Sequence, residues 1–161
     1  MESRVLGAIN LIGGPGGAIF ETSAEIGGST LPFRLELDYP GRFDERQLEQ
    51  LDDILLGWER IDAMAEESLT KAMENPESAP AQLFQLWEDE DPQRAGKTSQ
   101  FLAELQPLSV TVLWDIDGIH KDRIVMPYSY SPLAEKVTLR FKDRIGVEID
   151  PAPRGGYQPL R

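Results

Sequence analysis

Two segments contain the residue types that phosphate-binding loops use. Gly13–Gly17 holds four glycines around Pro15, and Gly96-Lys97-Thr98 matches the end of a Walker motif. A phosphate loop needs free backbone amides at a helix N-terminus, and the Walker motif needs a further glycine five residues before its second glycine. Pro15 lacks an amide hydrogen, and Asp91 occupies the position of that further glycine. We therefore expect a turn at 13–17 and no nucleotide site at 96–98.

The single histidine, His120, lies in a segment rich in aspartate. A histidine that acts as a general base is usually supported by a nearby carboxylate or nucleophile. Here the neighbouring pair Asp117-Gly118 is typical of a turn, which favours an exposed loop histidine. The segment from Asp115 also begins like a calcium loop, but its twelfth position is Met126 where an EF-hand needs glutamate. The sequence therefore predicts no catalytic residue and no metal site here.

Acidic residues outnumber basic ones by 28 to 16, which gives a net charge of −12, and cysteine is absent. The charge disfavours nucleic acids and anionic membranes and favours a basic protein partner. Without cysteine the chain has no disulfide, thiol nucleophile or zinc–thiolate site. A glycosidase needs two carboxyl groups across a cleft, but among so many acids the sequence favours no pair. We expect neither an enzyme nor a bound cofactor.

The N-terminus lacks the features of a secretory signal. Its apolar run, Val5–Ile12, is short, follows an acidic residue, Glu2, and ends in glycines. No stretch of the sequence reaches the ~20 apolar residues needed to cross a bilayer. We therefore expect a cytoplasmic protein.

The negative charge is concentrated in the middle of the chain. Residues 41–91 carry fifteen acids and four bases, whereas residues 92–161 carry eight acids and ten bases. The middle third also has a helical pattern: apolar residues recur every three or four positions between Asp44, a capping residue, and the helix-ending pair Asn75-Pro76. We predict one long amphipathic helix there. Its acids fall largely outside the apolar stripe: Asp52, Asp53, Glu59, Asp62 and Glu66.

Strand patterns precede and follow this helix. Three strands are predicted before it, at Val5–Ile12, Ala18–Ile26 and Phe33–Tyr39, and two short helices after it, at Ala81–Glu88 and Ser99–Leu105. Four further strands are predicted at Ser109–Ile116, Arg123–Tyr130, Lys136–Lys142 and Arg144–Asp150. This order indicates an α+β fold: an antiparallel or mixed sheet built from N-terminal and C-terminal meanders, with the helices covering one face. Residues 1–150 would form one domain, and the proline-rich tail, 151–161, would pack poorly.

The first of the two short predicted helices, Ala81–Glu88, contains an aromatic residue that is followed by acids. Trp87 precedes Glu88, Asp89, Glu90 and Asp91. An exposed indole beside carboxylates is a typical hot spot for a basic partner, since the ring supplies buried area and the acids supply steering. The alternative is that Trp87 packs in the core while the acids remain solvated. With the acids of the long helix, these five residues form the predicted binding surface.

The segment LSVTVLWDIDGIHKDRIVMPYSYSPLAEKVTLRFKDRIGVEID, residues 108–150, resembles the C-terminal strands of immunity proteins from bacterial polymorphic toxin systems. The resemblance implies a protein that binds a basic, secreted toxin domain and occludes its active site. It carries over no individual residue, because such families bind through divergent surfaces. Two other functions stay open: an adaptor that uses a sheet edge, and an enzyme with an unrecognised carboxylate site.

Overall fold

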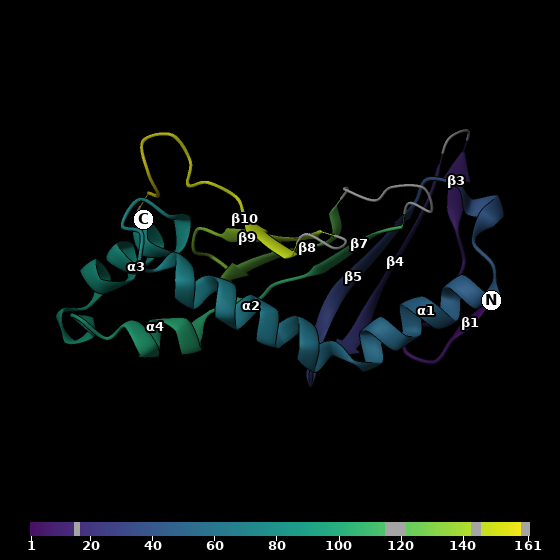
Figure 1. Ribbon diagram of the computed structural model, residues 1–161, viewed down its shortest axis with the longest axis horizontal. Helices are drawn as coiled ribbons and strands as arrows, with labels where there is room; N and C mark the ends of the chain where they lie inside the picture. Colours follow the sequence, from purple (N-terminus) through teal and green to yellow (C-terminus); the bar gives the residue numbers. More distant parts are fainter. Residues whose placement is uncertain (15–16, 115–121, 143–145, 159–161) are drawn as a thin grey trace.

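Alternating apolar residues build a mixed eight-stranded sheet. The computed structural model describes residues 1–14, 17–114, 122–142 and 146–158. Along β5 (Ser29–Leu37) every second side chain is buried, from Leu31 to Leu37, while Arg34 and Glu36 lie on the opposite face. This period of two makes one side of the sheet apolar and leaves the other polar. The helices cover the apolar side (Figure 1).

Two antiparallel meanders meet in the middle of the sheet. The first consists of β3 (Ile12–Gly14), β4 (Gly17–Ile26) and β5, and the second of β7 (Val110–Trp114), β8 (Asp122–Ser129), β9 (Val137–Lys142) and β10 (Gly146–Ile149). A parallel pairing of β5 with β7 joins them, and β6 (Gln106–Pro107) pairs with β8. The predicted α+β fold with a mixed sheet is confirmed.

The first predicted strand, Val5–Ile12, is wrong. Residues 2–8 instead form a small separate hairpin of β1 (Glu2–Ser3) and β2 (Gly7–Ala8), and the meander begins only at Ile12. Gly7 has a positive φ of 74°, which breaks an extended run at its centre. The apolar Leu6 and Ile9 on either side are buried in the core.

The predicted long helix is interrupted at Gly57. It consists of α1 (Glu45–Leu56) and α2 (Trp58–Ala72), preceded by a 3-10 turn, η1 (Pro40–Arg42). The Asp44 side chain caps α1 by accepting a hydrogen bond from the Gln47 amide, as the sequence predicts. Gly57 has φ −93° and ψ 32°, outside the helical values, because glycine holds the helical backbone weakly. The apolar stripe continues across the break, so both helices bury the same side.

The remaining helices lie at the other end of the molecule. They are α3 (Ala79–Glu90), η2 (Pro92–Arg94) and α4 (Thr98–Glu104). Figure 1 shows α1 and the N-terminus at one end of the sheet and α3, α4 and the C-terminal segment at the opposite end. Within the described ranges, no helix combines the length and the apolarity that crossing a bilayer requires.

The segment after β10 contacts the rest of the protein through a few residues, while Pro151, Pro153, Arg154, Gly155 and Gln158 are exposed. Ala152 and Tyr157 pack against the core, and the Tyr157 hydroxyl donates a hydrogen bond to the Lys136 carbonyl at 2.9 Å. Gly156 lies beside Gln82 of α3. The described part of the tail therefore crosses from the sheet edge to α3.

Candidate functional site

Trp87 is a core residue, which corrects its prediction as an exposed anchor. Its side chain is 0% exposed, and its ring lies 5.5 Å from that of Phe101. The indole nitrogen donates to Glu104 Oε2 at 2.6 Å, and the Arg94 guanidinium lies over the ring, 4.8 Å from its centroid. Trp87 follows the buried Leu83 by four positions, so helical geometry turns it inward although acids follow it in sequence.

The acidic run after Trp87 stabilises the connection between α3 and α4. Glu88 accepts a hydrogen bond from the Gly96 amide at 2.7 Å, and the Asp91 side chain caps η2 by accepting from the Gln93 amide. Glu90 pairs with Arg94 and accepts from the Tyr130 hydroxyl. Asp89 is exposed. Three of these four carboxylates are therefore engaged within the chain, and the run does not form a free docking surface.

Asp52 and Asp53 hold the N-terminal hairpin on α1. Asp52 is only 2% exposed and accepts hydrogen bonds from the Ser3 hydroxyl and the Arg4 amide. The exposed Asp53 forms an ion pair with the Arg4 guanidinium at 2.9 Å. Both predicted binding residues thus have partners inside the chain, and Asp52 is inaccessible to another protein.

The structure brings together the other three predicted acids. Glu59, Asp62 and Glu66 are exposed and follow one another at spacings of three and four along α2, so they share one side of the helix. None of them forms an ion pair with any residue that the structure describes. We call these three residues the acidic flank of α2.

A cleft of about 450 Å³ opens beside the acidic flank, between α2, α4 and β6. Asp62 and Glu66 line it from α2. Six apolar side chains form its walls: Ala65 and Leu69 of α2, Leu102 and Ala103 of α4, Leu105, and Pro107 of β6. Ser99, Gln106 and Thr70 add polar groups around them. The cleft therefore combines apolar walls with a carboxylate-rich side.

Tyr128 of β8 reaches the cleft from the sheet. It is 4% exposed, it lines the cleft, and its hydroxyl makes no hydrogen bond to the residues in the described ranges. Burial, and secondarily the charge of Asp62, raises the pKa of the Tyr128 phenol, so it stays protonated. Burial also raises the pKa of Asp62, against a hydrogen bond from the Trp58 side chain that lowers it. The charge of Asp62 therefore acts on the Tyr128 phenol, and both residues line the same cleft.

Sequence reasoning selected Asp62 and Glu66 but missed Tyr128, Ser99 and Gln106. Tyr128 follows Met126 by two positions in β8, so both side chains are expected on the same, inward face of the strand. This spacing does not indicate which residues lie opposite Tyr128. Only the packing of α4 against α2 brings these positions together. No local pattern in the sequence signals that contact.

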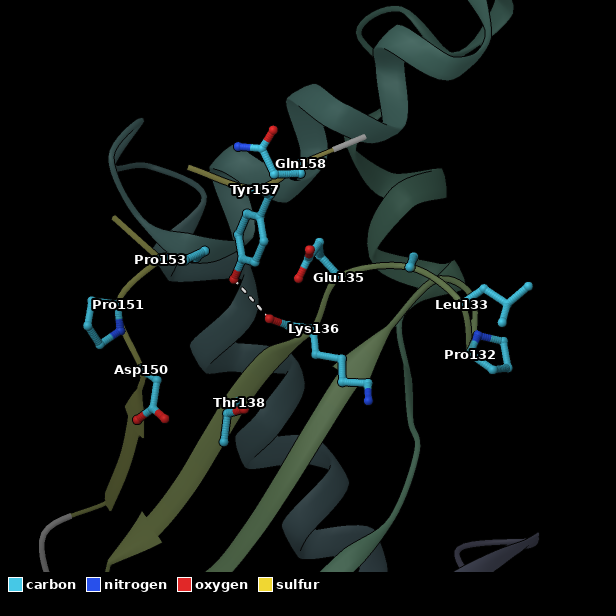
Figure 2. A pocket seen from close by; sticks show the side chains of 11 residues that line it. Pro132, Leu133, Glu135, Lys136, Thr138, Asp150, Pro151, Pro153, Tyr157 and Gln158 are labelled. Atoms are coloured by element: carbon cyan, nitrogen blue, oxygen red, sulfur yellow. Dashed lines mark hydrogen bonds between the residues drawn. The ribbon is translucent and has the colours of Figure 1, made fainter. Parts of the chain in front are cut away.

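A second hollow, of about 870 Å³, lies where the C-terminal segment crosses the β8–β9 connection (Figure 2). Its Tyr157 hydroxyl is already bound to the Lys136 carbonyl. Figure 2 shows the Asp150 carboxylate and the Lys136 ammonium well apart, on either side of Thr138. Asp150 is held instead by Arg140, at 2.8 Å. The titratable groups here do not converge, so this hollow lacks the chemistry of the α2–α4 cleft.

The remaining candidate motifs give no site. Gly96-Lys97-Thr98 leads into α4, whose seven residues are preceded by a positive φ at Gly96. His120 and the Asp115-Asp117 segment lie outside the described residues, as do Pro15 and Gly16 of the glycine cluster. In the ranges that are described, no group of three or more His, Cys, Asp or Glu side chains could hold a metal ion.

No family model, curated protein or solved structure matches this chain.

Proposed function

We propose that this protein binds a basic protein partner on the acidic flank of α2, as an immunity protein binds and occludes a bacterial toxin domain. The observation that carries the proposal is the set of exposed carboxylates, Glu59, Asp62 and Glu66, which have no ion-pair partner among the described residues and lie beside an open cleft. Exposed carboxylates on such a surface steer a basic partner toward it and exclude acidic competitors.

The distribution of charge over the helices supports this placement. Arg60 precedes Asp62 by two positions and Lys71 follows it by nine. At about 3.6 residues per turn, both basic side chains lie on the opposite side of α2 from Asp62. The acids of the flank therefore face solvent without a basic neighbour on their own helix side. The middle third of the chain carries a net charge of −11, so its field would steer a basic partner toward these helices.

The edges of the sheet are the alternative surface, for an adaptor function. They are the strands β3 and β10, of three and four residues. Because β3 pairs only with residues 17–19 of β4, residues 20–26 of β4 have no strand partner on that side among the described residues. Salt distinguishes the two surfaces: binding at a sheet edge would be insensitive to salt, whereas binding at the acidic flank would weaken as salt is added.

The test is affinity capture with paired variants. The Glu59→Gln/Asp62→Asn/Glu66→Gln protein removes the acidic flank, and Glu49→Gln/Glu67→Gln/Glu74→Gln makes the same charge change at other exposed positions. From a lysate of the native host, the wild type and the control variant should retain the same basic protein. The flank variant should bind it at least tenfold more weakly in a titration with the purified partner.

Two further results decide the proposal. The captured partner, expressed alone, should arrest bacterial growth, and coexpression of this protein should restore it. Equal binding by the flank variant and the control variant would remove the acidic flank as the binding surface. A partner that is harmless when expressed alone would remove the immunity function.

An enzyme with a carboxylate site is the second candidate, because Asp62 has a raised pKa and lies in a cleft beside Tyr128. Raised carboxyl pKa values in clefts are common at general acid sites. A panel of 4-nitrophenyl glycosides distinguishes the two. Turnover that disappears in Asp62→Asn would favour the enzyme, whereas the binding proposal predicts no turnover.

A further inference from the structure

The Tyr128 side chain offers a hydroxyl group to the α2–α4 cleft. The residue is 4% exposed and lines the cleft. Among the described residues, the buried side-chain atom left without a hydrogen-bond partner is Gln47 Oε1, so the Tyr128 hydroxyl is in contact with solvent. A ligand group that enters the cleft would meet this hydroxyl, which can both donate and accept a hydrogen bond.

The other polar groups of the cleft limit what that ligand can be. Asp62 and Glu66 offer carboxylate oxygens, and the Gln106 amide nitrogen is already engaged with the Ala103 carbonyl. The Thr70 hydroxyl donates to the Glu66 carbonyl, so it too presents a lone pair rather than a proton. Acceptors therefore dominate the cleft, and they favour a ligand that is positively charged and rich in N–H donors.

The walls of the cleft suit the stem of such a ligand. Ala65, Leu69 and Leu102 line the cleft with apolar surface, together with the carboxylates and Tyr128. A long basic side chain buries its methylene groups against surface of this kind while its charged head reaches polar groups. The cleft of about 450 Å³ is large enough for one such side chain and is open to solvent.

We infer that the cleft between α2 and α4 receives an arginine side chain of the partner, with the guanidinium between Asp62, Glu66 and the Tyr128 hydroxyl. Arginine fits better than lysine because its planar group carries five donors, enough for several separated acceptors at once. Buried arginines are frequent hot spots of protein interfaces. This inference rests on the proposed function and names the partner group that the acidic flank recognises.

The experiment uses a small probe on the intact protein. We would titrate the ¹⁵N-labelled chain with Nα-acetyl-L-arginine N-methylamide and follow the backbone amides by NMR. Saturable shifts should appear at cleft residues such as Ala65, Leu102 and Gln106. The citrulline analogue, which has nearly the same shape but no charge, should bind at least tenfold more weakly.

Matched variants locate the probe. Asp62→Asn should weaken arginine binding at least tenfold, and Tyr128→Phe should weaken it several-fold because it removes only the hydroxyl. Glu67→Gln, on the opposite side of α2, should leave binding unchanged. The spectrum of each variant without probe shows whether it has folded.

Three results would overturn the inference: equal binding of the citrulline analogue, shifts spread outside the cleft, or equal effects of Asp62→Asn and Glu67→Gln. Failure here is distinguishable from failure of the proposed function. If the cleft does not bind the probe but the acidic flank still captures a basic partner, the arginine inference fails and the proposed function stands. If the cleft binds the probe but partner binding does not depend on the acidic flank, the proposed function fails and the cleft remains an arginine site.

Discussion

At the scale of single residues, carboxylates that look alike in the sequence have three different environments. Asp52 is buried and satisfied by Ser3 and the Arg4 amide, whereas the adjacent Asp53 is exposed and paired with the Arg4 side chain. Asp62 is partly desolvated beside an open cleft. Buried hydrogen-bonded carboxylates stabilise a fold, exposed pairs contribute little, and unpaired desolvated ones are available to a ligand.

The first prediction follows from the contrast between Asp52 and Asp53. Asp52→Ala leaves the Ser3 hydroxyl and the Arg4 amide without their acceptor in a buried position. We expect it to lower the free energy of unfolding by about 1–3 kcal/mol, measured by urea denaturation. Asp53→Ala is the control, and it should leave the urea midpoint unchanged. Equal effects of the two substitutions would contradict the structural role of Asp52.

The second prediction concerns the pH dependence that Asp62 imposes on stability. Burial raises the pKa of Asp62 in the folded protein above that of the unfolded chain. The folded state therefore binds this proton more tightly, so the contribution of Asp62 is most favourable at low pH and is lost as the pH rises through its folded pKa. The thermal midpoint of the wild type, relative to Asp62→Asn, should fall as the pH is raised from about 4 to about 6. A difference that stays constant or grows would contradict the raised pKa.

At the scale of elements, the β4–β5 turn is fitted against the start of α2. Gly27 and Gly28 form this turn with φ values of 60° and 82°. A Cβ at Gly27 would lie 2.9 Å from Trp58 Cδ1 and 3.1 Å from Asp62 Oδ2, whereas a Cβ at Gly28 would meet nothing within 4 Å. The turn therefore fixes the position of α2, and with it one side of the cleft.

The third prediction uses this pair of glycines. Both Gly27→Ala and Gly28→Ala place a side chain in the left-handed region, which costs about 1–2 kcal/mol. Gly27→Ala should cost a further ~1–3 kcal/mol, because its methyl group collides with Trp58. Chemical denaturation of both variants measures the difference directly. Equal losses of unfolding free energy in the two variants would show that a methyl group at position 27 does not collide with α2.

Sequence patterns predict the elements better than the contacts between them. The alternation along β5 and β9 and the cap at Asp44 act locally, so they can be found without the fold. The direction of Trp87 depends on the phase of α3, and the adjacent acids misled the prediction because neighbouring helical residues point in different directions. The cleft could not be predicted, since Asp62 and Tyr128 meet only through the packing of α2 on the sheet.

At the scale of the whole molecule, the net charge of −12 is carried mainly by the helical layer. The segment 92–161, which supplies β6 to β10, five of the eight strands of the sheet, carries a net charge of +2. The helices are therefore close to one another with charges of the same sign, which destabilises the compact state through repulsion. The same excess of negative charge attracts a cationic partner to this surface.

The fourth prediction is that salt acts on folding and on binding with opposite signs. Raising NaCl from about 0.01 M to about 0.15 M shortens the screening length from about 30 to about 8 Å, which weakens repulsion within the helical layer. The thermal midpoint should rise by about 2–4 °C, the shift that ~1 kcal/mol produces in a domain of this size. Over the same range the basic partner should bind more weakly, because the attraction to the acidic flank is screened as well. The Glu49→Gln/Glu67→Gln/Glu74→Gln variant should show a smaller rise in the midpoint. A midpoint that falls with salt would mean that attractive ion pairs, and not repulsion, dominate the helical layer.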